Sequence, residues 1–375
     1  MHKKKNVMIL MESLVFGGAE KQVISLVNNI DTDKFTVTIC YFNKKEDLYP
    51  QINKNKVKDI LCFNRTKKFD FAILKKIKEL CDSNKYDILM CISPYPMLYA
   101  YIVKIFWRIE FKIFIAIHLT IINPGIWMKL KYIFFRKIIN RCDKILFVCK
   151  NQMKYWIEKY NINPSISHYI YNGIDINYFN EPILKETKEM IRSKYRIYPK
   201  DIVIGNVAAL RSEKKHKDIV SAAKTLRAEG YSVKVLIVGD GPCKDDIIKY
   251  SRLIGMEDHV IITGFQEDIR PYLSIFDCKI ISSDAVETFS IAALEAMAMS
   301  KPIILTNIGG ASEMVFDGEN GFVFPARDID ALVTKIRYII DNELFDSMGR
   351  RSREILEERF TLQNMISEYE KWFVT

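Results

Sequence analysis

Short apolar segments rich in β-forming residues alternate with longer amphipathic segments along the whole chain, and no other feature of the sequence restricts the fold as strongly. This order is typical of parallel sheets covered by helices. The strands expected in a first series are 7–11, 36–41, 58–62, 88–92, 113–117 and 144–148. A second series comprises 202–206, 234–238, 260–263, 278–282, 302–306 and a short edge strand at 321–323. The sequence therefore predicts two doubly wound α/β domains in tandem.

Chain length agrees with this prediction, because 375 residues at about 150 per domain correspond to two domains. We expect the first domain over 1–185 and the second over 186–358, with a cleft where the loops at the carboxyl ends of both sheets converge. A hydrophobic content of 49% excludes disordered, collagen-like and disulfide-stapled classes. The eight Cys form no Cys-x-x-Cys pair, which favours reduced thiols and a cytoplasmic protein. No apolar stretch is long and unbroken enough to predict a membrane-spanning helix.

Charge is distributed unevenly between the two halves. Residues 1–150 hold 27 Lys or Arg against 13 Asp or Glu, whereas residues 201–375 hold 21 against 28. In 124–141 the cations are interspersed with aromatic side chains: Trp127, Lys129, Lys131, Tyr132, Phe134, Phe135, Arg136, Lys137 and Arg141. We interpret 124–141 as a contact for an anionic membrane surface, at the inner face of the cell membrane, rather than for nucleic acid. The alternative is an ordinary helix that buries one face, because apolar residues recur every fourth position at Ile126, Leu130, Phe134 and Ile138.

The segment 282–313 carries the most specific signal. Glu287 and Glu295 are eight residues apart, and the apolar run ALEAMAM indicates a buried helix. If the helix begins at Phe289, Glu287 lies near its amino end and Glu295 two turns further, a spacing of about 12 Å. Two acceptors so placed can hold two hydroxyl-bearing rings, and the N–H groups at the amino end of the helix suit a phosphate between them.

The pattern E-x7-E before LEAMA, followed by a strand, Gly-Gly and Glu, resembles the nucleotide-sugar site of retaining GT-B glycosyltransferases of the family 4 group. Five further segments agree with it: Gly17-Gly18-Ala19-Glu20, Asn172-Gly173-Ile174-Asp175, Arg211-Ser212-Glu213-Lys214-Lys215, Val238-Gly239-Asp240-Gly241-Pro242 and Thr263-Gly264-Phe265. The match extends over essentially the whole chain. It implies the GT-B fold, two Rossmann-like domains facing across a cleft, with a C-terminal helix within 359–375 that packs back on the first domain.

The resemblance also implies roles for individual residues. Glu295 would accept hydrogen bonds from the ribose hydroxyls, and Glu287 would meet the donor sugar. Arg211 and Lys214 would neutralise the pyrophosphate, and His118 would lie beside the anomeric carbon. The other donor-binding positions are Gly17, Gly18, Lys215, Gly239, Phe265, Thr288, Phe289, Ser290 and Ile291.

Two departures from the family pattern bear on these roles. The position of the commoner arginine is Ala209, so we assign the phosphate contact to Lys214 before Arg211, and Lys215 could share it. Thr288 and Ser290 replace the more usual glycines, which leaves the donor sugar open. The structural alternatives are a tight turn for Gly17 and Gly18 and a solvated charge for Lys215. For His118 the alternative, favoured in the absence of the resemblance, is a core residue.

The predicted function is a retaining, metal-independent glycosyltransferase that moves a hexose or N-acetylhexosamine from a UDP-sugar to a hydroxyl of a growing, lipid-linked glycan. No cofactor is expected, and the Asp-x-Asp patterns at 31–33 and 328–330 are interpreted as structural rather than metal-binding. The alternatives are a GT-B nucleotide-sugar epimerase or phosphorylase, and a binding subunit without catalysis. The last would require lost site residues, whereas Glu287, Glu295, Lys214 and His118 are all present.

Overall fold

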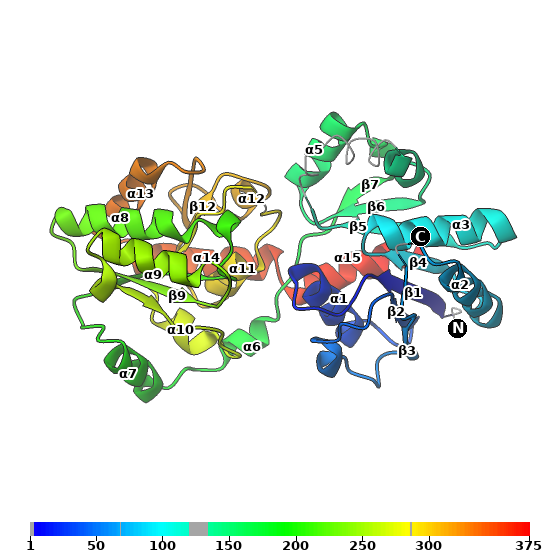
Figure 1. The fold of residues 1–375 in the computed structure, drawn as a ribbon, viewed down its shortest axis with the longest axis horizontal. Helices are drawn as coiled ribbons and strands as arrows, with labels where there is room; N and C mark the ends of the chain where they lie inside the picture. Colours follow the sequence, from blue (N-terminus) through cyan, green and yellow to red (C-terminus); the bar gives the residue numbers. More distant parts are fainter. Residues whose placement is uncertain (1–3, 68, 120–133, 286) are drawn as a thin grey trace. The chain divides into compact units, whose positions relative to one another are not determined.

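The computed structural model describes residues 4–67, 69–119, 134–285 and 287–375. The chain divides into two compact units, each of which is considered by itself (Figure 1). Unit 1 comprises Met1–Gly173 and Leu362–Thr375, and unit 2 comprises Ile174–Thr361. Each unit contains one parallel sheet with helices on its faces, which confirms the predicted pair of α/β sheets.

Unit 1 is built on a seven-stranded sheet with the order β3-β2-β1-β4-β5-β6-β7. The strands are β1 (Lys5–Met11), β2 (Phe35–Tyr41), β3 (Asp59–Cys62), β4 (Ile88–Cys91), β5 (Lys112–Ile117), β6 (Lys144–Phe147) and β7 (Ser167–Tyr169). The longer helices are α1 (Gly18–Asn29), α2 (Phe71–Asn84), α3 (Pro94–Trp107), α5 (Lys150–Tyr160) and α15 (Leu362–Val374). The sequence did not predict β7, because Ser-His-Tyr contains no apolar run.

Successive residues of the central strand β1 enter two different cores. Val7 and Ile9 pack in the core that includes α1 and α15, whereas Met8 and Leu10 pack in the core that includes α2 and α3. Side chains of a strand point alternately to opposite faces, so a strand covered on both faces is apolar throughout. This is why the first segment reads as one continuous apolar run.

Helix α15 completes unit 1 although it follows all of unit 2 in sequence. Its apolar face enters the unit 1 core through Leu362, Met365, Ile366, Tyr369 and Phe373. The ring of Phe373 lies 5.8 Å from that of Phe35 and 6.1 Å from that of Phe114, between ring centroids. The sheet of unit 1 is therefore covered in part by the last segment of the chain.

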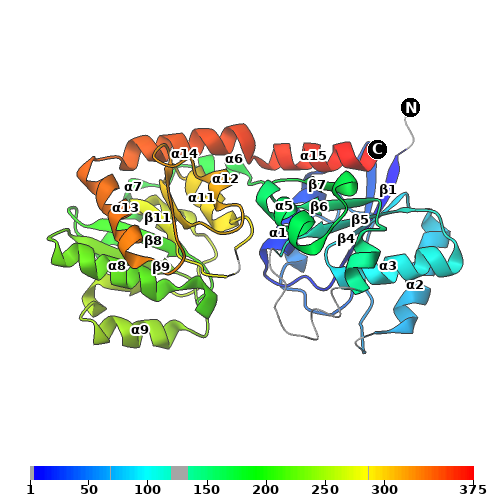
Figure 2. The same cartoon turned by 90° about the horizontal axis from the view of Figure 1, so that it is seen from above.

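Unit 2 is built on a six-stranded sheet with the order β10-β9-β8-β11-β12-β13. The strands are β8 (Ile202–Val207), β9 (Val233–Val238), β10 (Val260–Ile262), β11 (Cys278–Ile281), β12 (Ile303–Thr306) and β13 (Gly321–Phe324). Its helices are α6 (Ile176–Asn180), α7 (Lys185–Lys194), α8 (His216–Ala228), α9 (Lys244–Leu253), α10 (Arg270–Ser274), α11 (Ile291–Ala298), α12 (Ala311–Met314), α13 (Ile329–Asp341) and α14 (Phe345–Arg359). Figure 2 shows α14 on the side of this sheet opposite α8 and α9. The predicted edge strand at 321–323 is β13.

The direction in which strands are added reverses once in each sheet. In unit 1 this point lies between β1 and β4, and in unit 2 it lies between β8 and β11. Open α/β sheets bind ligands at the carboxyl ends of the strands beside such a point. A ligand site in unit 2 is therefore expected at the loops that follow β8 and β11.

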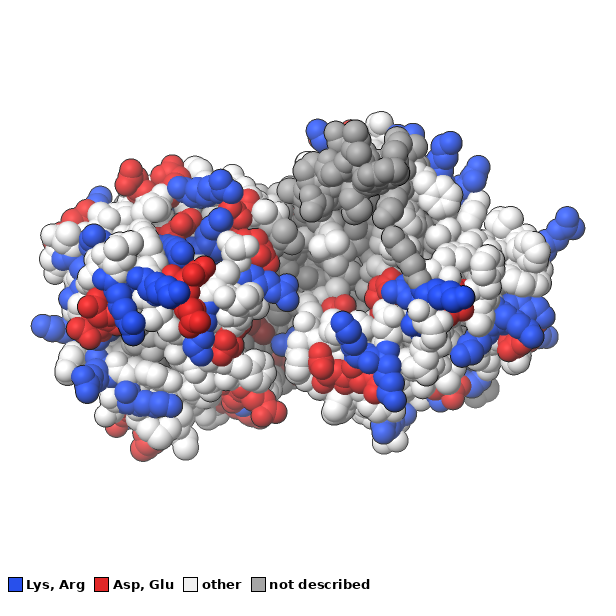
Figure 3. Space-filling view, viewed as in Figure 1, with Lys and Arg blue, Asp and Glu red and all other residues white. Residues whose placement is uncertain are grey.

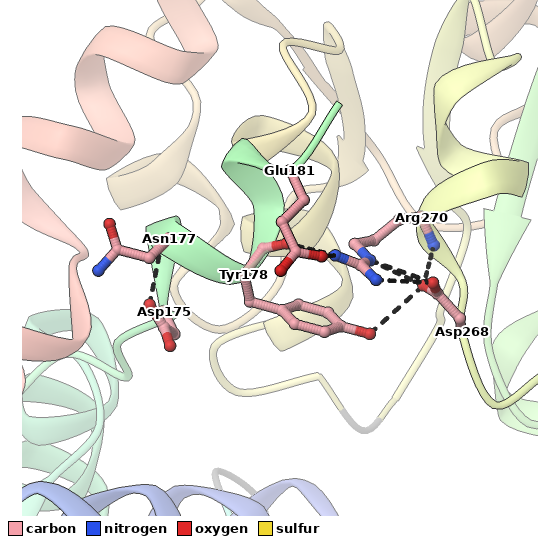
Figure 4. A network of polar contacts seen from close by, with 6 residues as sticks. All are labelled: Asp175, Asn177, Tyr178, Glu181, Asp268 and Arg270. Carbon is pink, nitrogen blue, oxygen red and sulfur yellow. Dashed lines mark hydrogen bonds and ion pairs between the residues drawn. The ribbon is translucent and has the colours of Figure 1, made fainter. Parts of the chain in front are cut away.

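A polar network attaches α6 to unit 2 (Figure 4). The guanidinium of Arg270 binds Glu181 at 2.6 Å, the carbonyl oxygen of Tyr178 at 2.7 Å and Asp268 at 2.8 Å. Its Cζ also lies 3.9 Å from the ring centroid of Tyr178. The chain consequently enters unit 2 at Ile174, whereas the sequence analysis placed the boundary after residue 185.

Candidate functional site

The carboxyl ends of β8 and β11 bring together the loops that carry most of the predicted site residues of unit 2. The amide of Asp284, after β11, donates to the carbonyl oxygen of Glu213, after β8, at 3.0 Å. The hydroxyl of Ser282 donates to the carbonyl oxygens of Lys214 at 2.9 Å and Lys215 at 3.0 Å. The two loops are thus fixed to each other by one backbone hydrogen bond and by the Ser282 hydroxyl.

Lys214 and Glu287 form an ion pair at this junction. Nζ of Lys214 lies 2.6 Å from Oε2 of Glu287, and the two side chains are 22% and 19% exposed. The hydroxyl of Ser283 donates to the same carboxylate oxygen at 3.1 Å. The structure therefore brings together two of the four predicted catalytic residues.

Lys215 is held in a different ion pair. Its Nζ lies 3.2 Å from Oδ2 of Asp284, which Arg327 also binds at 2.7 Å. Burial acts to raise the pKa of Asp284, but hydrogen bonds from Arg327 and Lys215 hold it below its ordinary value. Lys215 has a left-handed backbone (φ 48°) and precedes α8, so the chain turns between the two lysines and directs them to different partners. Arg211, three residues before Lys214, is exposed.

Helix α11 begins at Ile291, two residues later than the sequence analysis expected. The hydroxyl of Ser290 caps it by accepting from the amide of Ala293 at 3.3 Å. Phe289 is only 4% exposed, and its ring centroid lies 5.3 Å from that of Phe360. Glu287 consequently lies in the loop before the helix and not beside its first residue. The helix begins late because Ser290, with an extended backbone, is its N-cap and because the ring of Phe289 packs inward against Phe360.

Gly309 and Gly310 hold the backbone on which Glu287 lies. The amide of Gly310 donates to the carbonyl oxygen of Thr288 at 2.7 Å. Gly309 has φ +58°, and a Cβ on it would lie 2.1 Å from the carbonyl oxygen of Glu287. Only glycine permits both this backbone conformation and this close approach.

Lys279 lies beneath the same junction and was not identified from the sequence. It belongs to β11 and is 0% exposed. Its Nζ lies 2.9 Å from Oδ1 of Asn206 and 3.3 Å from the carbonyl oxygen of Val207, at the end of β8. The charges of Glu295 on α11 and of Glu287 both act on it. No local pattern marks such a residue, because lysine is almost never fully buried.

Gly239 lies on the loop after β9, and Phe265 lies on the loop after β10. The amide of Gly239 donates to the carbonyl oxygen of Gly264 at 2.9 Å, which joins the ends of β9 and β10. A Cβ on Gly239 would lie 2.1 Å from the carbonyl oxygen of Ala208, so this glycine lets the loop after β8 approach closely. Phe265 is 67% exposed.

In unit 1, Gly17 and Gly18 lie at the amino end of α1. Gly17 is the N-cap and has an ordinary extended φ of −152°. A Cβ on it would lie 2.1 Å from Oε2 of Glu20, the far end of a flexible side chain. Burial raises the pKa of Glu20, and a hydrogen bond to its own backbone opposes the rise. These two glycines therefore allow, but do not require, a close backbone approach by a ligand.

His118 follows β5 of unit 1. Its Nε2 is buried and has no hydrogen-bond partner among the residues that the structure describes. Burial lowers the pKa of His118 to about 4, so the imidazole is neutral near pH 7. A neutral ring with an available nitrogen can hydrogen-bond a ligand without adding a charge.

Gln152 of α5 fixes the backbone on both sides of His118 and was also missed by the sequence analysis. Its Nε2 donates to the carbonyl oxygens of Ile117 at 2.9 Å and Leu119 at 3.0 Å. Its Oε1 accepts from the amide of Val148 at 2.9 Å, and the side chain is 0% exposed. A single buried amide thereby sets the direction of the chain at His118.

The predicted membrane contact 124–141 lies partly outside the described residues, since 120–133 include Trp127, Lys129 and Lys131. Residues 134–139 are helical, with Ile138 buried and Phe134 53% exposed. Phe134 is therefore exposed, whereas the alternative of a helix with one buried face would bury it.

The end of α3 exposes three large apolar side chains. Ile105 is 60%, Phe106 75% and Trp107 36% exposed. Arg141 donates to the hydroxyl of Tyr101 on the same helix at 3.1 Å. Figure 3 shows an uncharged area over the outer end of α3 with Lys and Arg side chains around it.

Two features are absent from the described residues. No helix in them is long and apolar enough to cross a bilayer. Nor do they contain three or more His, Cys, Asp or Glu side chains gathered in a metal-binding group.

Each unit of the chain is matched by a model of a known protein family. The model of Glycosyltransferase Family 4 matches residues 16–178, and that of Glycosyl transferases group 1 matches residues 187–359. The chain is 28% identical over 309 residues to N-acetyl-alpha-D-glucosaminyl L-malate synthase of Bacillus anthracis, covering 80% of this chain and 78% of that protein. It is 23% identical over 352 residues to N-acetylgalactosamine-N,N'-diacetylbacillosaminyl-diphospho-undecaprenol 4-alpha-N-acetylgalactosaminyltransferase of Campylobacter jejuni, covering 89% and 90%. The crystal structure of Anabaena HepE in complex with UDP has a TM-score of 0.85 at 19% identity, covering 98% of this chain and 99% of that one.

Parallel sheets of seven and six strands, each doubly wound, constitute the GT-B fold of glycosyltransferases. Within that class the chain belongs to the glycosyl transferases group 1, or glycosyltransferase family 4.

Proposed function

We propose that the enzyme transfers a hexose or N-acetylhexosamine, with retention of configuration, from a UDP-sugar to a hydroxyl of a growing, lipid-linked glycan. The observation that carries this proposal is the ion pair of Lys214 and Glu287. It joins a cation suited to phosphate and a carboxylate suited to sugar hydroxyls where β8 and β11 end. The name of the Campylobacter jejuni relative specifies a diphospho-undecaprenol acceptor, which supports a lipid-linked glycan.

Donor binding would separate Lys214 from Glu287 and give each of them a partner on the donor. The pyrophosphate would take the ammonium of Lys214 together with the exposed Arg211, and Glu287 would then accept from hydroxyls of the donor sugar. Glu295 on α11 would accept from the ribose hydroxyls, and amides at Phe289 to Ile291 would bind the phosphates at the amino end of the helix. Thr288, Ser290, Lys215, Gly239, Phe265, Gly17 and Gly18 would line the remainder of the donor site.

The transfer step needs little covalent chemistry from the protein. The bond from the anomeric carbon to the β-phosphate oxygen breaks, a bond to the acceptor oxygen forms on the same face, and the acceptor proton passes to the leaving phosphate. Lys214 and Arg211 would stabilise the charge that develops on this phosphate, so that no metal ion is required. The neutral imidazole of His118 would hydrogen-bond the reacting sugar.

A membrane position for unit 1 would bring it to a lipid-linked acceptor. The excess of Lys and Arg over residues 1–150 suits anionic lipid, and the exposed end of α3 at Ile105, Phe106 and Trp107 suits the interface between headgroups and acyl chains. The segment 124–141 would add further cations. The enzyme would then act at the inner face of the cell membrane, as a peripheral protein.

A donor screen tests the proposal. Purified enzyme is incubated with UDP-, GDP- and ADP-sugars and an undecaprenyl-diphosphate-linked sugar, and nucleoside diphosphate release and a new glycosidic bond are both measured. We expect both products with a UDP-sugar. Sugar epimerisation or sugar phosphate formation without a new glycosidic bond would instead identify a nucleotide-sugar epimerase or a phosphorylase.

A further inference from the structure

Lys279 is a fully buried lysine whose ammonium supports the start of the loop after β8. It donates to Oδ1 of Asn206 at 2.9 Å and to the carbonyl oxygen of Val207 at 3.3 Å. The loop that begins at these residues carries Arg211 and Lys214. A change at Lys279 would therefore be transmitted to the cations of the proposed donor site through two hydrogen bonds and a short stretch of backbone.

His216 fixes the orientation of the amide that receives this ammonium. Oδ1 of Asn206 accepts from Lys279, so its Nδ2 faces Nδ1 of His216, at 3.4 Å. Burial lowers the pKa of His216 to about 4, although a hydrogen bond with the backbone of Ala209 acts to raise it. The neutral ring can accept from Asn206 in the tautomer that has no proton on Nδ1. The three side chains form a polar chain from β11 through β8 to the first residue of α8.

The charges around Lys279 come from the donor site itself. Burial lowers the pKa of Lys279 to about 7, while Glu295 on α11 and Glu287 after β11 act to raise it, and Lys214 acts to lower it. The neighbouring side chain on α8, His216, is neutral at this pH. In the unliganded protein burial thus makes the ammonium of Lys279 easier to deprotonate than that of an exposed lysine, and Glu295 and Glu287 oppose this effect.

We propose that Lys279 is a positioning residue whose ammonium holds the loop after β8 and balances Glu287 and Glu295, so that binding of a nucleoside diphosphate is coupled to protonation of this lysine. The inference rests on the proposed function, since it requires the diphosphate to bind at Lys214. The physical reason is electrostatic. A bound diphosphate adds negative charge and engages Lys214, and both effects favour the ammonium form of Lys279.

Substitution of Lys279 by Met or Gln tests the proposal, with UDP as the probe. Lys279→Met removes the charge at similar volume, and Lys279→Gln removes the charge but keeps a donor for Asn206. The matched control is Lys234→Met, because Lys234 is also buried on a strand of this sheet and donates to a carbonyl oxygen, that of Asp258 at 3.0 Å. UDP affinity is measured by calorimetry at pH 6, 7, 8 and 9, and thermal stability is measured in parallel. Ionisation of UDP itself affects all the proteins equally.

The expected result is a pH-dependent difference in affinity. At pH 6 the wild type should bind UDP about tenfold more tightly than either Lys279 variant. This factor corresponds to a rise of roughly one unit in the pKa of Lys279 when UDP binds. At pH 9 the difference in UDP affinity between the wild type and the variants should shrink to less than about twofold. Lys279 of the wild type is then largely deprotonated and uncharged, like the residues that replace it in the variants. Lys234→Met should bind UDP as the wild type does.

Several outcomes would overturn the inference. Equal UDP affinity of the wild type and Lys279→Met across this pH range would exclude the coupling, as would full restoration by Lys279→Gln. A loss of affinity of the same size at every pH, together with lower thermal stability, would show a structural role only. If neither variant folds, proton uptake is measured when the wild type binds UDP at pH 8. Uptake supports the inference, and its absence contradicts it. A wild type that binds no UDP would instead refute the proposed donor.

Discussion

Nζ of Lys214 lies 2.6 Å from Oε2 of Glu287, although the two residues are 73 positions apart in sequence. The pair joins the loop after β8 to the loop after β11, and the two loops are also held together by Ser282 and Asp284. An ion pair that is partly exposed can open for a stronger anion at modest cost. Under the proposed function the pair would open on donor binding, with Lys214 turning to the phosphate and Glu287 to the sugar.

Adjacent lysines with different partners should respond differently to truncation. Lys214→Ala should lower kcat by about 10² to 10³, the range for loss of one group that stabilises developing charge. Lys215→Ala should have a much smaller effect, because its ammonium binds Asp284 instead. Steady-state kinetics of both variants check this expectation. The reverse order of effects would show that Lys215 is the phosphate ligand.

Gly309→Ala should damage activity through the backbone of Glu287. The added Cβ would lie 2.1 Å from the carbonyl oxygen of Glu287 and must displace it. A displacement of about 1 Å at a reacting group can lower the rate by about 10²-fold. Gly255→Ala is the control, since Gly255 also has positive φ (+71°) but no atom within 4 Å of the added Cβ. Similar rates for the two variants would refute this role of Gly309.

Gln152→Leu should reduce kcat more than it changes KM for the donor. It removes the hydrogen bonds to the carbonyl oxygens of Ile117 and Leu119 that set the direction of the chain at His118. Each buried group left unpaired should also lower the free energy of unfolding by about 1–3 kcal/mol. Thr38→Val, which removes the partner of the Tyr86 hydroxyl on the same sheet, should destabilise without that change in kcat. An unaltered kcat in Gln152→Leu would show that Gln152 does not affect catalysis.

Activity should persist in EDTA. In the proposed mechanism Lys214 and Arg211 take the charge of the leaving phosphate, a role that a divalent cation has in other enzymes. Nucleoside diphosphate release is measured before and after dialysis against EDTA, with and without added Mg²⁺ or Mn²⁺. Loss of turnover that only a divalent cation restores would refute the metal-independent mechanism.

Vesicle binding should require acidic lipid and should weaken as salt rises past roughly 0.15 M, where the Debye length is about 8 Å. Two variants separate charge from apolar insertion. One replaces Lys129, Lys131, Arg136 and Lys137 by Gln, and the other replaces Ile105, Phe106 and Trp107 by Ser. Both should lose binding in a flotation assay yet keep turnover on a soluble acceptor analogue.

The control for the charge variant exchanges four exposed lysines of unit 2 for Gln: Lys185, Lys200, Lys224 and Lys249. It should bind vesicles as the wild type does. Equal binding of the wild type to neutral and acidic vesicles would refute an electrostatic membrane contact. Full binding by the variant of Ile105, Phe106 and Trp107 would show that α3 does not insert.

Most strands could be predicted because a parallel sheet covered on both faces requires continuous apolar runs, and β1 and β9 show that pattern plainly. β7 could not, since its three residues carry no such run. The start of α11 was misplaced because Phe289 is buried against Phe360, a residue far along the chain. Local propensity contains no information about such a partner.

The sequence by itself determined the fold class and the two βα series, because apolar periodicity is a local property of the chain. The roles of the candidate residues Lys214, Glu287, Glu295 and His118 came from the resemblance of the sequence motifs to those of family 4 glycosyltransferases. Only the tertiary structure decided that Lys214 rather than Lys215 pairs with Glu287, and that Gln152 supports His118. Only the tertiary structure placed Lys279 beneath the site. The physical reason is that burial, hydrogen bonding and pKa depend on groups that become neighbours only when the strands of each sheet are assembled.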